Sequence, residues 1–184
     1  MNRRLLLLLV CSLPLGAAES AIELDPARTT VSFTVDSVLH TVHGSFKLKR
    51  GWLKFDSATG SASGEIVVDV TSGESGNSSR DNRMQKEILE SPRFPEAVFT
   101  PDHIAGALAP SGRSQLDLHG TFQLHGTSHE MTLHFQAEVK GSELVTSTEF
   151  RIPYIQWGMK NPSTFVLRVS DTVEMHIEAT GRVQ

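Results

Sequence analysis

Apolar and polar residues alternate strictly along two neighbouring stretches of this chain, and that pattern constrains the fold more than any other feature. In the first stretch, the apolar face consists of Leu116, Leu118, Gly120, Phe122 and Leu124. After a turn at residues 126–129, the apolar face of the second stretch consists of Met131, Leu133, Phe135, Ala137 and Val139. A repeat of two residues is the side-chain period of a β-strand. The pattern predicts an antiparallel hairpin with one buried face.

The same alternation recurs through most of the chain, at residues 30–36, 42–48, 52–55, 64–70, 97–99, 145–152, 164–169 and 173–179. Residues 49–51 and 57–63 have the composition of turns. Eight or more strands with short connections predict an all-β fold, an antiparallel sandwich or barrel. A closed barrel has no exposed strand edges, and one of eight strands can hold a small ligand. Alternation alone does not separate a packed core from a lined cavity.

A charged segment at residues 78–90 interrupts this pattern. Ser78 or Ser79 can cap a helix there, with Asp81 in its first turn. Met84, Ile88 and Leu89 then share an apolar face, and prolines at 92 and 95 end the segment. The sequence therefore predicts one short helical insert, which we interpret as a lid over one end of the barrel.

The first residues have the pattern of a secretory leader. Arg3 and Arg4 precede an apolar run at 5–15 and small residues at 16–18. We therefore expect a signal peptide over residues 1–18, a single domain over 19–184, and a periplasmic or secreted protein. The only cysteine, Cys11, lies in the leader, so the mature chain would contain neither a disulfide nor a thiolate metal site.

The charge of the mature chain argues against nucleic acid as a partner. Removing Arg3 and Arg4 leaves 17 − 2 = 15 basic residues against 21 acidic ones, a formal charge of −6. Nucleic-acid binding requires a basic face, which this balance does not favour.

Candidate catalytic and metal-binding residues are scattered. The chain has eight histidines, and His119 and His134 could approach each other across the predicted hairpin. A zinc site needs three or four converging ligands, so we interpret the histidines as surface residues and expect no metal. No nucleophile elbow, dinucleotide-binding or P-loop pattern is present. We expect neither catalysis nor a cofactor.

Several short motifs occur in a characteristic order: Val31-Ser32-Phe33-Thr34-Val35, Val42-His43-Gly44-Ser45-Phe46, Gly64-Glu65-Ile66, Arg80-Asp81-x-x-Met84, Phe94-Pro95-x-x-x-Phe99, Gly120-x-Phe122-x-Leu124-x-Gly126-Thr127 and Val169-Ser170-Asp171-x-Val173. Together they make the chain resemble the YceI-like family, lipocalin-like, polyisoprenoid-binding proteins of bacterial envelopes. Residues 156–163 depart from the aspartate-phenylalanine-glycine element that the family often carries late in the chain.

The resemblance implies a lipocalin-like antiparallel barrel of about eight strands, with a lipid tail in the lumen and the polar head near the mouth. The candidate cavity residues are Phe33, Val35, Phe46, Ile66, Val68, Met84, Ile88, Phe122, Leu133, Phe135, Phe150 and Phe165. Arg80 and Arg83 are the candidates for a charged head group. Alternatively, Arg80 and Asp81 form a salt bridge or capping pair that docks the helix.

The leading hypothesis is a non-catalytic periplasmic or secreted carrier for an amphiphilic lipid, of polyisoprenoid or related acyl type. One alternative is an interaction module with a packed core. The other is a lipid-modifying enzyme, which would need converging acid and base groups inside the lumen. The sequence leaves a homodimer open.

Overall fold

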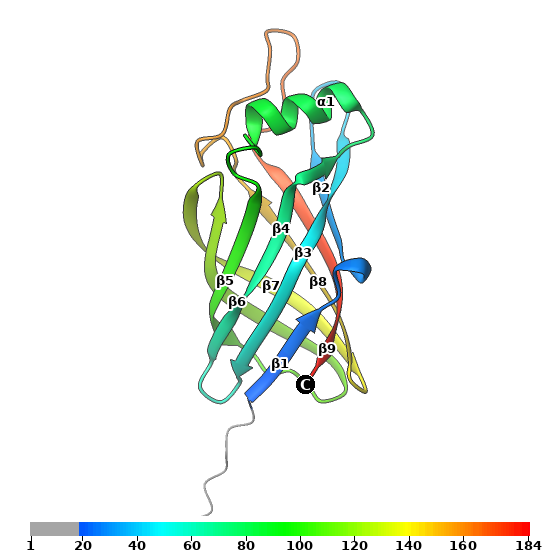
Figure 1. The fold of residues 1–184 in the computed structure, drawn as a ribbon, viewed down its shortest axis with the longest axis vertical. Helices are drawn as coiled ribbons and strands as arrows, with labels where there is room; N and C mark the ends of the chain where they lie inside the picture. Colours follow the sequence, from blue (N-terminus) through cyan, green and yellow to red (C-terminus); the bar gives the residue numbers. More distant parts are fainter. Residues whose placement is uncertain (1–18) are drawn as a thin grey trace, which may run out of the picture.

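Nine antiparallel strands close into a barrel in the computed structural model of this protein, which describes residues 19–184 (Figure 1). The leader predicted for residues 1–18 lies outside the described residues. The strands are β1 (Glu19–Leu24), β2 (Thr30–Val35), β3 (Val42–Asp56), β4 (Ser61–Glu74), β5 (Glu96–Ala105), β6 (Gly112–Leu124), β7 (Thr127–Lys140), β8 (Glu143–Ile152) and β9 (Val173–Val183).

The barrel has eight positions because β1 and β2 occupy one of them in succession. Both strands lie between β3 and β9: β1 pairs with one end of each, and β2 with the other end. The 3-10 turn η1 (Pro26–Arg28) separates them, and the Asp25 side chain accepts a hydrogen bond from the backbone N–H of Ala27 at 2.9 Å. Pairing of β3 with β4 closes the ring. The predicted all-β antiparallel barrel of about eight strands is confirmed, whereas the strand at Glu19–Leu24 was not predicted.

The hairpin of β6 and β7 joins Leu124 to Thr127 through a two-residue turn. His125 and Gly126 both have positive φ, 52° and 75°, the conformation of the type I′ turns that suit the twist of a hairpin. A Cβ atom on residue 126 would lie 2.6 Å from a ring carbon of Phe94. The predicted hairpin is correct, but its turn begins one residue earlier than expected, and residues 127–129 already belong to β7.

The turn predicted at residues 49–51 is wrong, because β3 continues through it. The register between β3 and β4 shifts between Leu48 and Arg50, which marks a β-bulge. Before the bulge the inward residues are even-numbered, such as Phe46 and Leu48, and after it they are odd-numbered, such as Leu53 and Phe55. Because the inward positions switch from even to odd at the bulge, the alternation in the sequence is interrupted although the strand is continuous.

The strand predicted at residues 164–169 is also wrong. β8 and β9 pair directly from Ile152 and Val173 onward, so the connection between them, residues 153–172, has no free place in the sheet. An isolated bridge between Ser37 and Val169 links it to the β2–β3 turn, residues 36–41. At the tip of this connection Phe165 is 98% exposed.

The helical insert is confirmed between β4 and β5, and it lies across one end of the barrel (Figure 1). It begins as α1 (Ser78–Arg83) and continues as one π-helical stretch, η2 (Met84–Ile88). The cap is Asn77 and not either serine, and its side chain accepts from the backbone N–H of Arg80 at 3.1 Å. None of the helices in the described part of the chain is long and apolar enough to cross a membrane.

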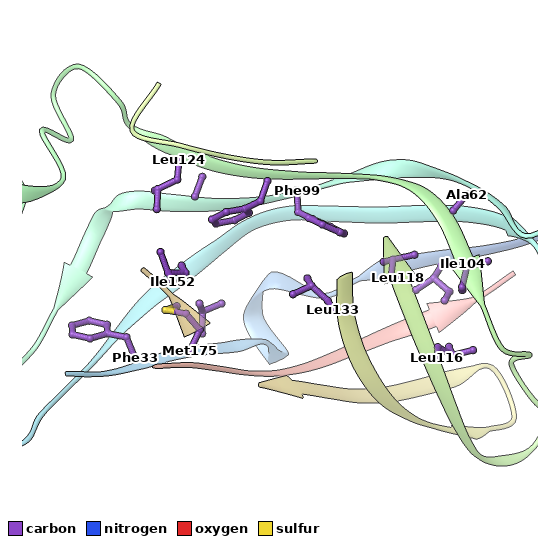
Figure 2. Packing of buried hydrophobic residues seen from close by; sticks show 14 of the residues in the cluster. Phe33, Ala62, Phe99, Ile104, Leu116, Leu118, Leu124, Leu133, Ile152 and Met175 are labelled. Carbon is purple, nitrogen blue, oxygen red and sulfur yellow. The ribbon is translucent and has the colours of Figure 1, made fainter. Parts of the chain in front are cut away.

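The end of the barrel opposite the helix is filled by side chains. Figure 2 shows Ala62, Ile104, Leu116 and Leu118 gathered together, away from Phe33, Ile152 and Met175. The buried residues of this floor are Ile22, Phe55, Ala62, Ile104, Leu116, Leu118, Val139 and Leu144.

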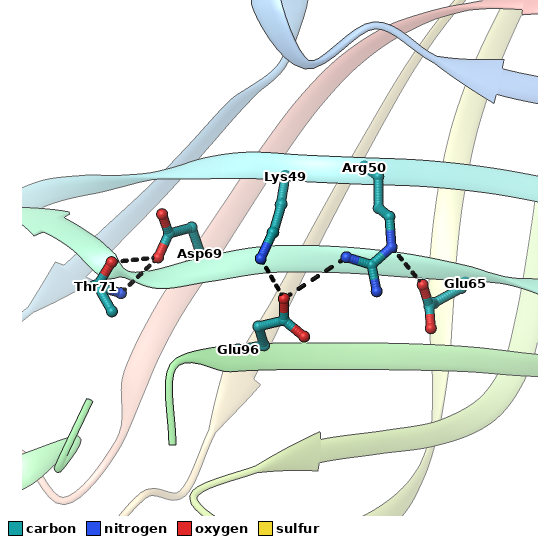
Figure 3. Close-up of polar contacts among 6 residues, drawn as sticks. All are labelled: Lys49, Arg50, Glu65, Asp69, Thr71 and Glu96. Atoms are coloured by element: carbon teal, nitrogen blue, oxygen red, sulfur yellow. Dashed lines mark hydrogen bonds and ion pairs between the residues drawn. The ribbon is translucent and has the colours of Figure 1, made fainter. Parts of the chain in front are cut away.

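A group of charged residues crosses the outside of β3, β4 and β5 beside the bulge (Figure 3). Glu96 accepts from Lys49 at 2.6 Å and lies 3.6 Å from Arg50, which also pairs with Glu65 at 2.7 Å. The hydrogen bond from Lys49 holds the pKa of the Glu96 carboxyl below its usual value. In the same view, the Asp69 carboxylate accepts from the backbone N–H and the hydroxyl of Thr71. Together these contacts bind three strands where the ladder is irregular.

Candidate functional site

A cavity of about 560 Å³ occupies the half of the barrel between the packed floor and the helix. Strands from around the ring line its walls with aliphatic and aromatic side chains, and Met84, Ile88 and Leu89 line it from the insert. The residues of the floor do not line it. The cavity is thus closed below, and at its other end it is lined by residues of the helix, of the β2–β3 turn and of the connection 153–172.

The structure brings together the cavity residues predicted from the sequence, with one exception. Those that line the cavity are Phe33, Val35, Phe46, Ile66, Val68, Met84, Ile88, Phe122, Leu133, Phe135 and Phe150. Their contact with a ligand stays a prediction. Phe165 does not line the cavity and points into solvent, because its segment lies outside the sheet.

Sequence reasoning missed several lining residues, for two different reasons. Val31, Phe99, Met175 and Ile177 lie on inward positions of strands. Their alternation was visible, but it did not separate cavity from core. By contrast, Tyr154 and Met159 come from the connection 153–172. No local pattern indicates that this irregular segment folds over the lumen.

Aromatic contacts hold the upper wall. The rings of Phe33 and Phe46 lie 5.2 Å apart at their centroids, and those of Phe122 and Phe150 lie 6.4 Å apart, edge to face. Trp157 extends this wall, 5.9 Å from Phe122 and stacked on His129 at 3.8 Å. Such pairs stabilise beyond the area they bury, so the start of the connection is fixed to the β6–β7 hairpin.

Arg80 and Asp81 both act on Ser75, at the end of β4. The Arg80 guanidinium donates to the Ser75 hydroxyl at 2.7 Å and to its carbonyl oxygen at 2.8 Å. Asp81 accepts from the Ser75 backbone N–H at 3.0 Å and from its hydroxyl. The two residues therefore dock the start of α1 through a shared serine. Arg80 nevertheless lines the mouth of the cavity.

Arg83 also lines the mouth and lies where the helix meets the connection 153–172. One of its terminal nitrogens donates to the Pro162 carbonyl oxygen at 3.4 Å, and its Nε lies 3.6 Å from Glu87. Lys160 donates to the same Glu87 carboxylate at 2.7 Å, which lowers the pKa of Glu87. These contacts latch the helix to the connection on one side of the opening.

Tyr154 supplies a buried polar group in the cavity wall. Its hydroxyl donates to the Ser170 carbonyl oxygen at 2.7 Å, and burial raises its pKa to about 12. The phenol therefore stays protonated and tethers the end of the connection. Of the described residues, those that line the cavity include no aspartate or glutamate, so the lumen offers no carboxylate as acid or base.

The histidines do not converge. His119 and His134 each bond an aspartate at 2.7 Å on the outer face, Asp102 and Asp117 respectively. The hydrogen bond to Asp102 raises the pKa of His119. Within residues 19–184, no three side chains of the metal-binding types group closely enough to hold an ion.

One family model and several solved structures match this chain. The model of the YceI-like domain matches residues 23–181. A polyisoprenoid binding domain from Saccharophagus degradans, implicated in plant cell wall breakdown, is 16% identical, with 89% of this chain and 98% of that one covered and a TM-score of 0.70. BcnA from Burkholderia cenocepacia is 18% identical, with coverage of 85% and 98% and a TM-score of 0.69.

A YceI protein from Campylobacter jejuni is 18% identical, with 77% of this chain and 84% of that one covered and a TM-score of 0.62. No curated protein sequence matches the chain. At these identities the structural matches establish the fold alone.

Proposed function

Because this chain belongs to the YceI-like family, we propose that it is a non-catalytic carrier that binds one amphiphilic lipid, of polyisoprenoid or related acyl type, in its barrel. The observation that carries the proposal is the form of the cavity. It is apolar along its walls and closed at the floor, and its arginines lie only at the mouth. A long apolar tail would lie inside, with its polar head beside Arg80 and Arg83.

The size and lining of the cavity suit such a ligand. Small-molecule pockets span about 300–1,000 Å³ and are mostly apolar, and this one is about 560 Å³. Each buried methylene contributes ~0.8 kcal/mol, so a tail of ten would contribute about 8 kcal/mol before ordering costs. Apolar burial is non-directional, so only the head group needs specific contacts.

The two alternative functions are less well supported. A barrel that serves only as an interaction module needs no lumen, and this one has a cavity bounded by a separate packed floor. A lipid-modifying enzyme would need an acid and a base that meet in the lumen. The titratable side chains that line the cavity are His40, Tyr154, Arg80 and Arg83, and the protonated Tyr154 is already bonded to a backbone carbonyl.

The site of action follows from the leader expected at residues 1–18. A carrier that leaves the cytoplasm would meet its lipid in the periplasm or outside the cell. This part of the proposal rests on the sequence of the leader, and cell fractionation tests it.

Extraction of the purified protein with organic solvent, followed by mass spectrometry, tests the function. We expect one prenyl or acyl lipid per chain, either co-purified or taken up from an offered mixture. A protein that stays empty when offered both classes would contradict the proposal, and release of a chemically altered lipid would support the enzyme instead.

A further inference from the structure

Two turns at the open end of the barrel carry large apolar side chains at their tips. The β2–β3 turn is closed between Ser37 and His40, whose backbone N–H and carbonyl oxygen bond at 3.2 Å. The tip of the connection 153–172 is closed between Thr164 and Leu167 in the same way, at 2.8 Å. The residues between these pairs are Val38 and Leu39 in the first turn, and Phe165 and Val166 in the second.

These four side chains are largely exposed. Val38 is 64% exposed, Leu39 69%, Phe165 98% and Val166 78%. Turn tips usually carry glycine, proline, asparagine, aspartate or serine, each of which suits the turn backbone. No such local reason exists for valine, leucine or phenylalanine, so their exposure calls for a partner outside the chain.

The two turns form one unit. The backbone N–H of Val38 donates to the Arg168 carbonyl oxygen at 3.0 Å, and that of Ser170 donates to the Asp36 carbonyl oxygen at 2.8 Å. The bridge between Ser37 and Val169 lies between these bonds. We call the four tip residues, Val38, Leu39, Phe165 and Val166, the rim patch. In Figure 1 both turns project from the end of the barrel that carries α1.

The rim patch continues the apolar surface of the cavity. Ser37 and His40 flank its first half and line the cavity, as do Leu167 and Val169 beyond its second half. An apolar ligand that enters between the helical insert and the joined turns passes beside the patch. The patch therefore lies where the lumen meets the environment from which the ligand comes.

Charges near the patch are balanced. The cations of the adjoining segments are Arg80, Arg83, Lys160 and Arg168, and the carboxylates are Asp36, Asp81, Glu87 and Asp171. Attraction to an anionic surface would need an excess of cations. Contact by this end must therefore depend on burial of the four apolar side chains.

We propose that the rim patch inserts into the interface of a zwitterionic phospholipid bilayer and sets the mouth of the cavity against it. The proposal rests on the proposed lipid binding, since it supplies the route by which an insoluble ligand reaches the lumen. The area of four side chains is small, so the association is weak and reversible.

Co-sedimentation with phosphatidylcholine vesicles tests the proposal. We expect the intact chain to partition onto the vesicles, and the double variant Leu39→Ser with Phe165→Ser to partition about tenfold less, in line with the apolar area removed. The matched control is Val145→Ser, since Val145 is 49% exposed on the outer wall of β8, and we expect it to partition like the intact chain. Raising salt from low to physiological concentration should change partitioning less than twofold.

Several results would overturn the proposal. Equal loss in the control and the rim variant would mean that general hydrophobicity drives binding. Binding only to anionic vesicles, and only at low salt, would mean electrostatic attraction elsewhere. Loss of a dimer in the rim variant, with no vesicle binding by the intact chain, would assign the patch to a second copy of the protein.

Bound lipid, measured by extraction and mass spectrometry, separates this inference from the proposed function. A rim variant that still accepts lipid from detergent micelles but not from vesicles supports both ideas. If the intact chain partitions onto vesicles but never retains lipid, the carrier function is contradicted and the membrane contact of the rim patch is supported. If the intact chain retains lipid but does not partition onto vesicles, the carrier function is supported and the membrane contact of the rim patch is contradicted.

Discussion

At the scale of single residues, Thr148 has the environment that fits its chemistry least. Strand β8 turns its side chain into the barrel, where it is 3% exposed. Its hydroxyl has no hydrogen-bond partner among the described residues. An unsatisfied buried polar group costs about 1–3 kcal/mol, whereas an apolar group of the same shape costs nothing comparable.

We therefore expect Thr148→Val to raise the free energy of unfolding by about 1 kcal/mol, measured by urea denaturation. The matched control is Thr146→Val on the same strand. The Thr146 hydroxyl donates to the Gln136 carbonyl oxygen at 2.9 Å, so this change should destabilise. A less stable Thr148→Val variant would mean that the hydroxyl has a partner such as water.

Glu96 makes a pH-dependent contribution to stability. Its pKa in the folded chain lies below the ordinary value of 4.5 because Lys49 donates to its carboxylate. A carboxyl with a lowered folded pKa stabilises the fold above its unfolded pKa, and the contribution is lost as the pH falls through the folded pKa.

For Glu96→Gln we expect a lower urea midpoint at pH 7, by the small amount typical of a surface ion pair. The difference from the unaltered chain should shrink as the pH falls below 4.5, and vanish once the carboxyl is protonated. Glu23→Gln serves as control, since Glu23 forms no ion pair among residues 19–184. A difference that stays constant from pH 7 to pH 3 would show that the charge of Glu96 is not its cause.

At the scale of elements, the insert formed by α1 and η2 is tied down at both ends by different chemistry. Ser75 holds its start through Arg80 and Asp81. Near its end, the Lys160–Glu87 contact latches it to the connection 153–172. The first tie lies within contiguous chain, whereas the second joins two segments that are far apart in sequence and lie at the same end of the barrel.

Lys160→Met should release that latch. We expect the dissociation rate of a fluorescent prenyl or acyl probe to rise roughly threefold, since an exposed ion pair contributes little, while the fold stays intact by circular dichroism. Lys86→Met is the control: Lys86 is exposed on the same helical insert and forms no ion pair among the described residues. Equal rates in both variants would show that the insert does not gate release.

Sequence reasoning at this scale succeeded where a pattern is local. The β6–β7 hairpin and the apolar face of the insert both depend on spacing within one element. Sequence reasoning failed at Leu48–Arg50, where a bulge switches the inward positions of a continuous strand from even to odd. It also failed at Glu19–Leu24, a short strand that is held by its pairing with β3 and β9. Residues 164–169 alternate like a strand but find no free sheet edge.

At the scale of the whole molecule, the barrel divides into a packed floor and a hollow upper half. Filling the hollow should abolish binding without unfolding the protein. Ala97 is suited to this test because it lines the cavity from β5, and its neighbour Val98 faces the other side of the sheet.

For Ala97→Phe we expect at least tenfold weaker binding of the probe, because the added ring occupies the volume of several methylenes that the tail would otherwise bury. Stability should change by about 1–3 kcal/mol or less, as the ring enters open space and not a filled core. Val98→Phe adds similar volume to the outer face and should bind normally. Unchanged binding by Ala97→Phe would place the ligand elsewhere.

Local patterns in the sequence determined an antiparallel sheet with one helical insert, and the resemblance to the YceI-like family implied that the sheet closes into a barrel. Within each regular strand the sequence also determined which side chains face inward, since parity fixes that, but not across the bulge at Leu48–Arg50. Only the tertiary structure decided that the inward residues of one half pack while those of the other line a cavity. That outcome depends on how strands distant in sequence meet and on how much volume they leave. For the same reason, only the fold showed that Phe165 lies outside the lumen, beside its mouth.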